Sequence, residues 1–309
     1  MTQVENNNST LLGGVEAGGT KFNCVIANRH AEIKASATFM TGSPDETLPK
    51  VRQFFIDEQK KHGPLAALGI ASFGPVELNQ KSHYYGYILS TPKESWSYTN
   101  MVGYFSDALD IPVGFETDVN GSALGESVYG AAKGLQNFVY VTVGTGIGAG
   151  IVNRGHLIQG LGHPEIGHML IPQDTNLDSF PGCCPFHGSC LEGLASGTAM
   201  NRRWKTPASI LADDHPAWDL EAQYLAAMCV NITHLYAPEK IILGGGVMNK
   251  ARLFPLIQKR FLTLMNGYGP DSIRQNPHTY IVPPGITDGK SGVIGALLLA
   301  EQAGTANAG

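Results

Sequence analysis

Charged side chains are sparse in this sequence. They account for 15% of the 309 residues, the formal net charge is −5, and Lys and Arg form no basic run. Proteins that bind nucleic acid or an anionic membrane surface usually carry such a run or patch. The sequence therefore argues against both kinds of partner.

Long apolar stretches are missing as well. No run approaches the roughly 20 residues that span a bilayer, and the N-terminal MTQVENNNST has neither the basic nor the apolar region of a signal peptide. The five cysteines are an odd number, and three of them fall within residues 183–190, which favours metal binding over disulfide bonds. These absences predict a cytoplasmic protein.

Glycine, in contrast, is abundant. The chain has 38 Gly and 18 Pro and is 43% hydrophobic, a composition typical of a loop-rich globular enzyme. Its length predicts two lobes, each with its own core.

Strand and helix patterns alternate along the chain. Strands are predicted at 12–17, 22–27, 32–38, 66–71, 111–117, 137–143, 147–152, 240–243 and 279–282. Helices are predicted at 47–61, 119–131, 191–204, 218–236, 251–264 and 291–302, and an irregular loop at 172–190. Two of the strand pairs enclose a glycine turn, about 130 residues apart, which suggests a duplicated unit.

The first glycine turn is Gly18-Gly19-Thr20-Lys21. It matches a P-loop only in part, because the order is Thr-Lys and a strand follows where a P-loop has a helix. Its exposed N–H groups, hydroxyl and ammonium suit a phosphate. An ordinary hairpin explains the turn equally well.

Two further glycine clusters follow strands. Around Gly144-Thr145-Gly146, Ala149 replaces the third glycine of a dinucleotide fingerprint and the next segment is extended, which disfavours a Rossmann dehydrogenase. Glycines beside Thr145 would let a nucleotide phosphate approach the backbone, or would simply close a hairpin. The third cluster would admit a flat ligand such as adenine and comprises Gly244, Gly245, Gly246 and Val247.

Asp118 lies at the predicted junction of strand 111–117 and the helix that follows. It could cap that helix, as Asp often does. Without the glycine turns capping would be the preferred explanation. The alternative is a general base, since phosphoryl transfer to a hydroxyl needs one carboxylate to accept the proton. Its position between two candidate phosphate-binding turns favours catalysis.

A cluster of Cys and His is the strongest local signal. Cys184, His187 and Cys190 form Cys-x2-His-x2-Cys, and His168 lies upstream. Together they offer the four ligands of a tetrahedral, structural zinc site. Cys184 is preferred over Cys183 because its spacing to His187 suits chelation, and three unligated thiols in a polar loop are the weaker alternative.

In combination these motifs resemble the ROK family of sugar kinases, and most closely its bacterial fructokinase branch. Five motifs occur in the family's order: EAGGTK, ETDVN, GTGIGAG, GHPEIGH with the Cys/His cluster, and LEGLASG followed by LGGGV. The resemblance extends from Gly13 to about Leu299.

The resemblance implies an α/β, actin-like fold, duplicated and ribonuclease-H-like, with ATP and sugar in a cleft between two lobes. The small lobe would comprise residues 1–118, completed by the C-terminal helix 291–309. The large lobe would comprise residues 119–290, including the zinc-binding loop 163–190. A homodimer is also implied.

Site residues follow from the resemblance, motif by motif. Asp118 would be the catalytic base, with Mg²⁺ accompanying ATP. Sugar hydroxyls would bind Thr117, Glu165, His168 and Glu192, and zinc would fix the loop that presents Glu165 and His168. The nucleotide would contact Gly18, Gly19, Thr20, Lys21, Gly144, Thr145, Gly146, Gly244, Gly245, Gly246 and Val247.

Three departures separate the chain from many relatives. Glu16 stands where many members have Asp, which leaves its role towards Mg²⁺ open. His187 and Thr117 stand where glucokinase-like members have Cys and Asn, and both match the fructokinase branch, as does the segment 90–96. We therefore expect ATP-dependent phosphorylation of a hexose, most of all fructose to fructose 6-phosphate.

Several alternatives stay open at this stage. Glucose, mannose or N-acetylmannosamine could be the acceptor in the same fold. A sugar-sensing repressor would need a DNA-binding region before the first glycine turn, and residues 1–12 carry no Lys or Arg. A zinc scaffold without activity would leave the three glycine clusters unexplained.

Overall fold

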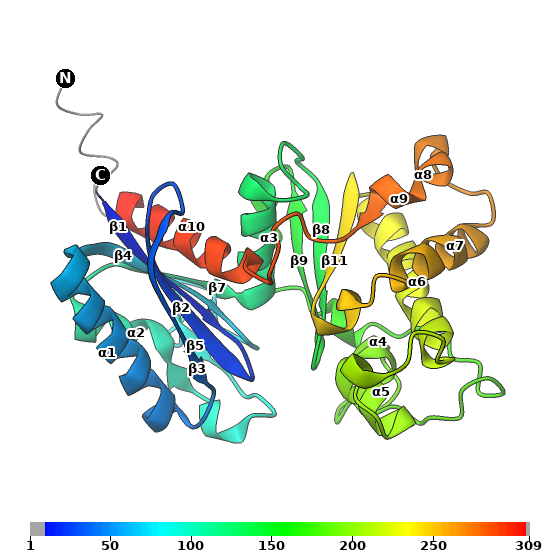
Figure 1. Ribbon diagram of the computed structural model, residues 1–309, viewed down its shortest axis with the longest axis horizontal. Helices are drawn as coiled ribbons and strands as arrows, with labels where there is room; N and C mark the ends of the chain where they lie inside the picture. Colours follow the sequence, from blue (N-terminus) through cyan, green and yellow to red (C-terminus); the bar gives the residue numbers. More distant parts are fainter. Residues whose placement is uncertain (1–9, 307–309) are drawn as a thin grey trace. The chain divides into compact units, whose positions relative to one another are not determined.

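The computed structural model describes residues 10–306 (Figure 1). Two of the predictions rest on residues 1–9, that of no signal peptide and that of no DNA-binding region, and these residues lie outside the described ones, as do residues 307–309 at the end of the predicted small lobe. The described chain forms two compact units. Unit 1 comprises residues 10–128, Gln159–His163 and 286–306, and unit 2 comprises Tyr129–Ile158 and Pro164–Gly285.

Unit 1 is built on a five-stranded sheet of order β3-β2-β1-β4-β7. Its strands are β1 (Leu11–Ala17), β2 (Lys21–Asn28), β3 (Ile33–Met40), β4 (Leu65–Ser72) and β7 (Val113–Thr117). The first three strands pair antiparallel, while β4 is parallel to both β1 and β7. A small hairpin, β5 (Tyr87–Ile88) with β6 (Thr99–Asn100), lies outside this sheet.

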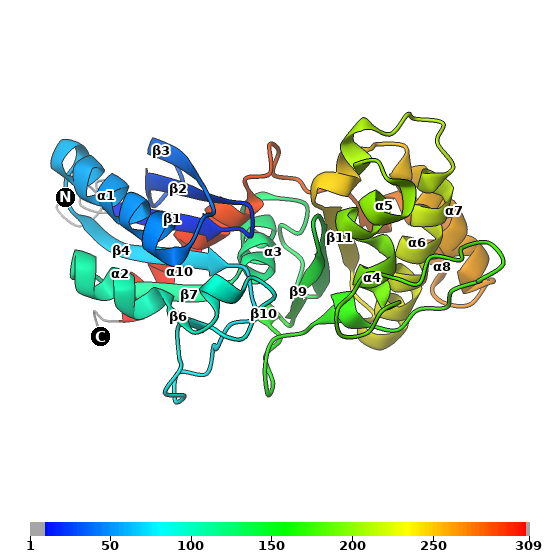
Figure 2. The ribbon, with the colours of Figure 1, turned by 90° about the horizontal axis from the view of Figure 1, so that it is seen from below.

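Helices cover both faces of the unit 1 sheet. Helix α10 (Ser291–Ala306) packs on β1, β4 and β7, while α1 (Pro44–His62) and α2 (Met101–Leu109) lie on the opposite face (Figures 1 and 2). The side chains of β1 and β2 form two sets, one on each face of the sheet, because successive residues of a strand point to opposite faces. Leu12 and Val25 pack with Leu297 of α10, whereas Val15 and Phe22 pack with Phe55 of α1.

Helix α3 (Asp118–Tyr129) follows β7 directly and packs closely against α10. A Cβ atom at Gly125 would overlap the carbonyl oxygen of Ser291, and one at Gly295 would overlap that of Gly121. Glycine at these two positions therefore permits the close contact between the helices. This contact fixes the first turn of α3, where Asp118 lies.

Unit 2 is built on a second five-stranded sheet, of order β10-β9-β8-β11-β12. The strands are β8 (Phe138–Val143), β9 (Ile147–Asn153), β10 (His156–Leu157), β11 (Lys240–Gly244) and β12 (Ile281–Val282). Helices α4 (Leu191–Ala195), α5 (Gly197–Trp204), α6 (Ala217–Tyr236) and α7 (Leu253–Met265) gather beside this sheet (Figure 2). Two short helices follow, α8 (Asp271–Gln275) and α9 (Pro277–Tyr280), and the single-turn segments of this unit are η2 (Ile166–His168), η3 (Ala208–Ile210) and η4 (Gly246–Asn249).

The two sheets repeat one pairing pattern. In each, a first strand pairs antiparallel with the second, which pairs antiparallel with the third, and the first strand is also parallel to a fourth that is parallel to a fifth. The predicted duplication is thereby confirmed. Each copy opens with a strand, a glycine turn and a strand.

Two predicted elements differ in the structure. The predicted helix 191–204 is two helices, because the Ser196 hydroxyl accepts a hydrogen bond from Ala199 N at 3.1 Å and begins α5 anew. The predicted strand 279–282 is limited to Ile281–Val282, because Pro277 at the first turn of α9 favours helix before it.

The lobe boundary between 118 and 119 stays a prediction, and α3 lies with unit 1 as far as Val128. Within residues 10–306, no helix combines the length and the apolar character that crossing a membrane requires.

A buried charge cluster anchors the irregular loop of unit 2 to its helices. Asp178 of that loop receives two hydrogen bonds from Arg203 of α5, at 3.1 and 2.9 Å, and one from the Tyr224 hydroxyl of α6 at 2.6 Å. Glu221, one turn before Tyr224, is 1% exposed, and neither carboxylate oxygen has a partner among the described residues. Burial raises the pKa of Glu221 well above its usual value, and the charge of Arg203 opposes this only in part.

This environment predicts a pH-dependent stability that Glu221→Gln removes. The folded state binds the Glu221 proton more tightly than the unfolded state, so the free energy of unfolding falls as the pH rises from about 4.5 towards the raised pKa. Each pH unit in that window lowers the free energy of unfolding of the wild type by about 1.4 kcal/mol. Glutamine has no proton to lose, so Tm measured across pH should shift in favour of the variant as the pH rises.

Glu301→Gln is a matched control for this series. Glu301 is also on a helix, but its side chain is 38% exposed. Its substitution should leave the pH dependence of Tm as in the wild type. A Tm difference between Glu221→Gln and wild type that stays constant with pH would contradict the buried, protonated state of Glu221.

Candidate active site and metal centre

Asp118 occupies the first position of α3, and Thr117 caps the helix. The Thr117 hydroxyl accepts a hydrogen bond from Asn120 N at 3.1 Å, the geometry of an N-cap side chain. Asp118 Oδ1 accepts from Val119 N at 2.9 Å, and its side chain is half-buried. The capping role considered for Asp118 thus belongs to Thr117.

Glu116 forms a buried polar network one position before Thr117. Its oxygens accept hydrogen bonds from the Asn120 side chain (2.7 Å), Thr117 N (3.1 Å) and the Gln159 side chain (2.6 Å). Burial raises the pKa of Glu116, and these donors together with the charge of His163 oppose the rise. The motif ETDVN contains Glu116, but no local pattern indicated Gln159 as its partner.

The motif GHPEIGH is divided between the two units. His163 belongs to unit 1, where its Nε2 accepts a hydrogen bond from Val76 N at 3.3 Å. Glu165 and His168 belong to unit 2. One short motif therefore supplies side chains to two structural environments.

The first glycine turn connects β1 and β2. Gly18 N donates to Lys21 O at 3.0 Å, and Gly19, Thr20 and Lys21 are all exposed. Glu16, at the end of β1, accepts a 2.8 Å hydrogen bond from the Asn23 side chain. Burial raises the pKa of Glu16, against the effects of this bond and of the Lys21 charge.

The second and third glycine clusters lie at the same end of two adjacent parallel strands. Gly244, at the end of β11, pairs with Thr142 near the end of β8. Gly245 has φ 93°, and a Cβ there would lie 2.5 Å from Val143 O, so only glycine fits this approach. The structure thus brings residues 144–146 and 244–247, which are distant in sequence, to one edge of the unit 2 sheet.

Helices α4 and α5 support the second glycine turn. Gly144 O accepts from Gly197 N at 2.7 Å, and Thr145 O accepts from the Thr198 hydroxyl at 2.7 Å. Glu192 Oε2 accepts from Ile147 N at 2.9 Å. The backbone of this turn is therefore held by fixed partners on its helical side.

The charges of His168 and Glu192 act on Glu165 within unit 2. The protein atoms around Glu165 raise its pKa although the side chain is exposed, the charge of His168 lowers it, and the charge of Glu192 raises it. These three residues were predicted to bind sugar hydroxyls. Glu165 therefore lies near enough to this imidazole and to the second carboxyl group for both to affect its pKa.

The Cys and His side chains of the predicted zinc set converge. Nδ1 or Sγ atoms of His168, Cys184, His187 and Cys190 all lie within 4.8 Å of one another. Sulfur-to-nitrogen distances are 3.6 and 3.7 Å from His168 to Cys190 and Cys184, and 3.7 Å from His187 to Cys184. A tetrahedral Zn²⁺ with ordinary bond lengths separates its S and N ligands by about 3.6 Å, so the four residues fit the ion.

Local backbone bonds shape this group. Cys184 and Gly188 exchange two hydrogen bonds, of 3.1 and 3.0 Å, which close a tight turn around His187. Cys183 does not belong to the converging group. The choice of Cys184 over Cys183 from spacing therefore agrees with the geometry.

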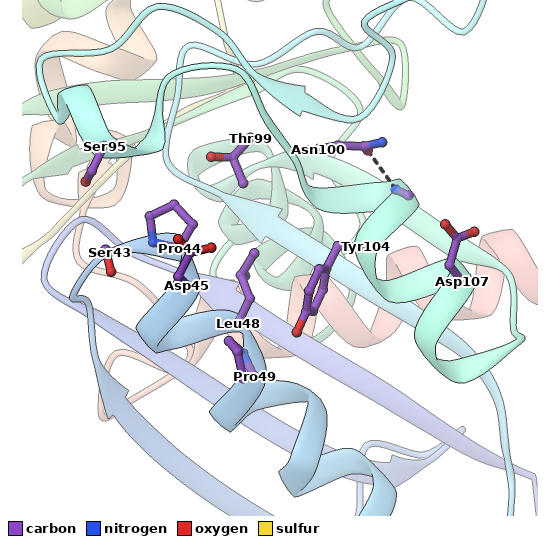
Figure 3. A pocket seen from close by; sticks show the side chains of 11 residues that line it. Ser43, Pro44, Asp45, Leu48, Pro49, Ser95, Thr99, Asn100, Tyr104 and Asp107 are labelled. Atoms are coloured by element: carbon purple, nitrogen blue, oxygen red, sulfur yellow. Dashed lines mark hydrogen bonds between the residues drawn. The ribbon is translucent and has the colours of Figure 1, made fainter.

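A separate cavity of about 630 Å³ lies in unit 1 between α1 and α2 (Figure 3). Two carboxylates, Asp45 and Asp107, line it, and among the described lining residues there is no Lys or Arg. Such a lining does not suit the phosphates of a nucleotide. None of the predicted site residues lines this cavity.

Known proteins show clear similarity to this chain. The fructokinase of Lactococcus lactis subsp. cremoris is 43% identical over 94% of this chain and 97% of its own, and that of Pediococcus pentosaceus is 41% identical over 95% and 98%. Among solved structures, a ROK family glucokinase from Streptomyces griseus, in complex with glucose and AMPPNP, has a TM-score of 0.75 at 24% identity, with 94% of this chain and 99% of that chain covered. The model of the ROK family matches residues 12–303. With its duplicated sheets and its motifs in order, the chain belongs to the ROK family.

Proposed function

We propose that this protein transfers the terminal phosphoryl group of ATP to fructose and forms fructose 6-phosphate. The near full-length similarity to fructokinases carries this proposal. The position of Asp118 supports it, because Thr117 supplies the helix cap and the Asp118 carboxylate is not needed for that role. A panel of hexoses tested with purified protein in a coupled ADP assay distinguishes fructose from glucose, mannose and N-acetylmannosamine.

In this proposal the three glycine clusters bind the nucleotide. The first two turns would donate backbone N–H groups to the phosphates, with Lys21 and Mg²⁺ balancing their charge. Gly244–Val247 would lie near adenosine, because the glycines leave the backbone open at the edge of the sheet. Thr117, Glu165, His168 and Glu192 would hydrogen-bond the hydroxyls of the sugar.

Asp118 would accept the proton of the attacking hydroxyl. Asp118→Asn keeps the shape of the side chain, and the cap on α3 comes from Thr117, so folding should survive. Turnover should fall by about two orders of magnitude or more, the usual contribution of a general base. Steady-state kinetics on protein with an unchanged Tm measures this, and near-native turnover would show that Asp118 is not the base.

Zinc is proposed as a structural ion of unit 2. Its ligands would be His168, Cys184, His187 and Cys190, which leave no open position for a substrate or water. The ion would hold the loop that presents Glu165 and His168. A homodimer, which the family resemblance implies, and a cytoplasmic location both stay predictions.

Elemental analysis of protein purified without added metal should find one zinc per chain. Cys190→Ser should lose the metal and lower Tm together, because the binding energy of a structural ion is also folding energy. Sugar affinity should weaken, since His168 loses its anchor.

Cys183→Ser is the matched control, because this neighbouring thiol lies outside the converging group. It should retain both zinc and Tm. Metal-free wild-type protein with full activity and unchanged melting would refute the structural role of zinc.

Acceptor preference is proposed to depend on Thr117. A threonine offers one hydroxyl and cannot supply both the donor and the acceptor of an Asn amide. In the structure this hydroxyl also accepts the capping bond from Asn120 N, which restricts its orientation. A sugar hydroxyl that lacks such a hydrogen-bond partner costs the transition state about 1–3 kcal/mol of stabilisation, which lowers kcat/KM by roughly one to two powers of ten.

We therefore expect a higher kcat/KM for fructose than for glucose, with glucose still used slowly. Thr117→Asn should narrow that ratio, since Asn keeps the helix cap and adds the amide. Thr117→Ser, which preserves the hydroxyl, should leave the ratio near that of the wild type. Equal kcat/KM for the two sugars in the wild type would reject the fructose assignment and leave the kinase assignment standing.

A further inference from the structure

Thr41 and Gly42, between β3 and α1, are bonded to two other segments of unit 1. On one side, Thr41 contacts the first glycine turn. Its hydroxyl donates to Gly18 O at 2.8 Å, and its N–H donates to Thr20 O at 2.9 Å. Thr41 thus holds two of the carbonyl groups in the turn proposed to bind phosphate.

On the other side, the same two residues receive bonds from the segment Lys93–Trp96. Lys93 Nζ donates to Thr41 O at 3.3 Å, and Trp96 Nε1 donates to Gly42 O at 2.8 Å. Trp96 is fully buried, with its ring 5.3 Å from that of Phe22 and 5.5 Å from that of Phe73. It is therefore a core residue that fixes the position of Gly42.

The bond to Gly18 O bears directly on phosphate binding. In a planar trans peptide the C=O of one residue and the N–H of the next point in opposite directions. With Gly18 O held by Thr41, the N–H of Gly19 points away from Thr41. Glycine on both sides of this peptide unit makes its rotation easy, so the hydrogen bond from Thr41 to Gly18 O favours one orientation.

We propose that Thr41 is a positioning residue that aims the Gly19 N–H at the nucleotide phosphates. We further propose that Lys93, in the segment 90–96, holds Thr41 in place through the hydrogen bond to Thr41 O. The inference rests on the proposed kinase function. Neither residue touches a reacting atom in this role. Thr41 acts through the backbone of the turn, and Lys93 acts through Thr41.

Thr41→Val tests the first part, because valine keeps the branched shape of threonine and replaces only the hydroxyl with a methyl group. The KM for ATP should rise about 3–10-fold, the loss of one hydrogen bond, while kcat at saturating ATP and the KM for fructose change less than about twofold. Thr41→Ser should restore the wild-type KM for ATP. Thr263→Val, at an exposed hydroxyl bonded within α7, is the matched control and should change neither constant.

Lys93→Met tests the second part. It should also raise the KM for ATP, and the double variant Thr41→Val/Lys93→Met should raise it by less than the product of the single effects, because both act on one element. If the increase in the KM for ATP in the double variant equals the product of the two single increases, Lys93 does not act through Thr41. An unchanged KM for ATP in Thr41→Val, or a Thr41→Ser variant as impaired as Thr41→Val, would overturn the positioning role.

Direct binding separates this inference from the proposed function. Calorimetry with ADP, without sugar, should show weaker binding to Thr41→Val and wild-type binding to Thr41→Ser, at equal Tm. A wild-type protein that binds ADP and phosphorylates no fructose would contradict the proposed function, and the Thr41 effect would still be read from ADP affinity. A wild type that binds no ADP would overturn both.

Discussion

Close approach of backbone to backbone is the constraint on which the candidate site depends. Helix α3 meets α10 where only glycine fits, at Gly125 and Gly295, and Gly245 lies against the backbone at the end of β8. The first contact sets where α3 begins and hence where the Asp118 carboxylate lies. The second sets the edge at which two glycine clusters meet. A methyl group at any of these positions would displace the backbone that carries the site.

The sequence predicted those parts of the fold that depend on local pattern. Alternation and glycine turns located both hairpins, and helical spacing located α1, α6 and α7, because one buried face imposes its period on the residues. The duplication was visible as two glycine hairpins, although their shared pairing order became evident only in the sheets. Cys184, His187 and Cys190 were recognisable because chelation by one loop requires fixed spacing.

Contacts between distant segments could not be predicted in the same way. Gln159 reaches Glu116, and Thr41 reaches Gly18, through tertiary packing that leaves no period or motif in the sequence. The break between α4 and α5 escaped notice for a different reason. Ser196 is acceptable inside a helix and marks a boundary only through the hydrogen bond that its side chain makes.

The packing of α10 on β1 and β4 has a consequence for how the protein is made. These elements are far apart in the sequence, so the sheet of unit 1 is synthesised well before α10, which follows all the strands and helices of unit 2. Until then, Leu12, Val25 and Ala67 lack the apolar surface that covers them in the finished molecule. Unit 2 meets no such delay, because its strands and helices lie within residues 129–285. During translation, unit 2 is therefore able to form its core while one face of the unit 1 sheet is still uncovered. In that period the apolar side chains on this face are exposed to aggregation and to chaperone binding.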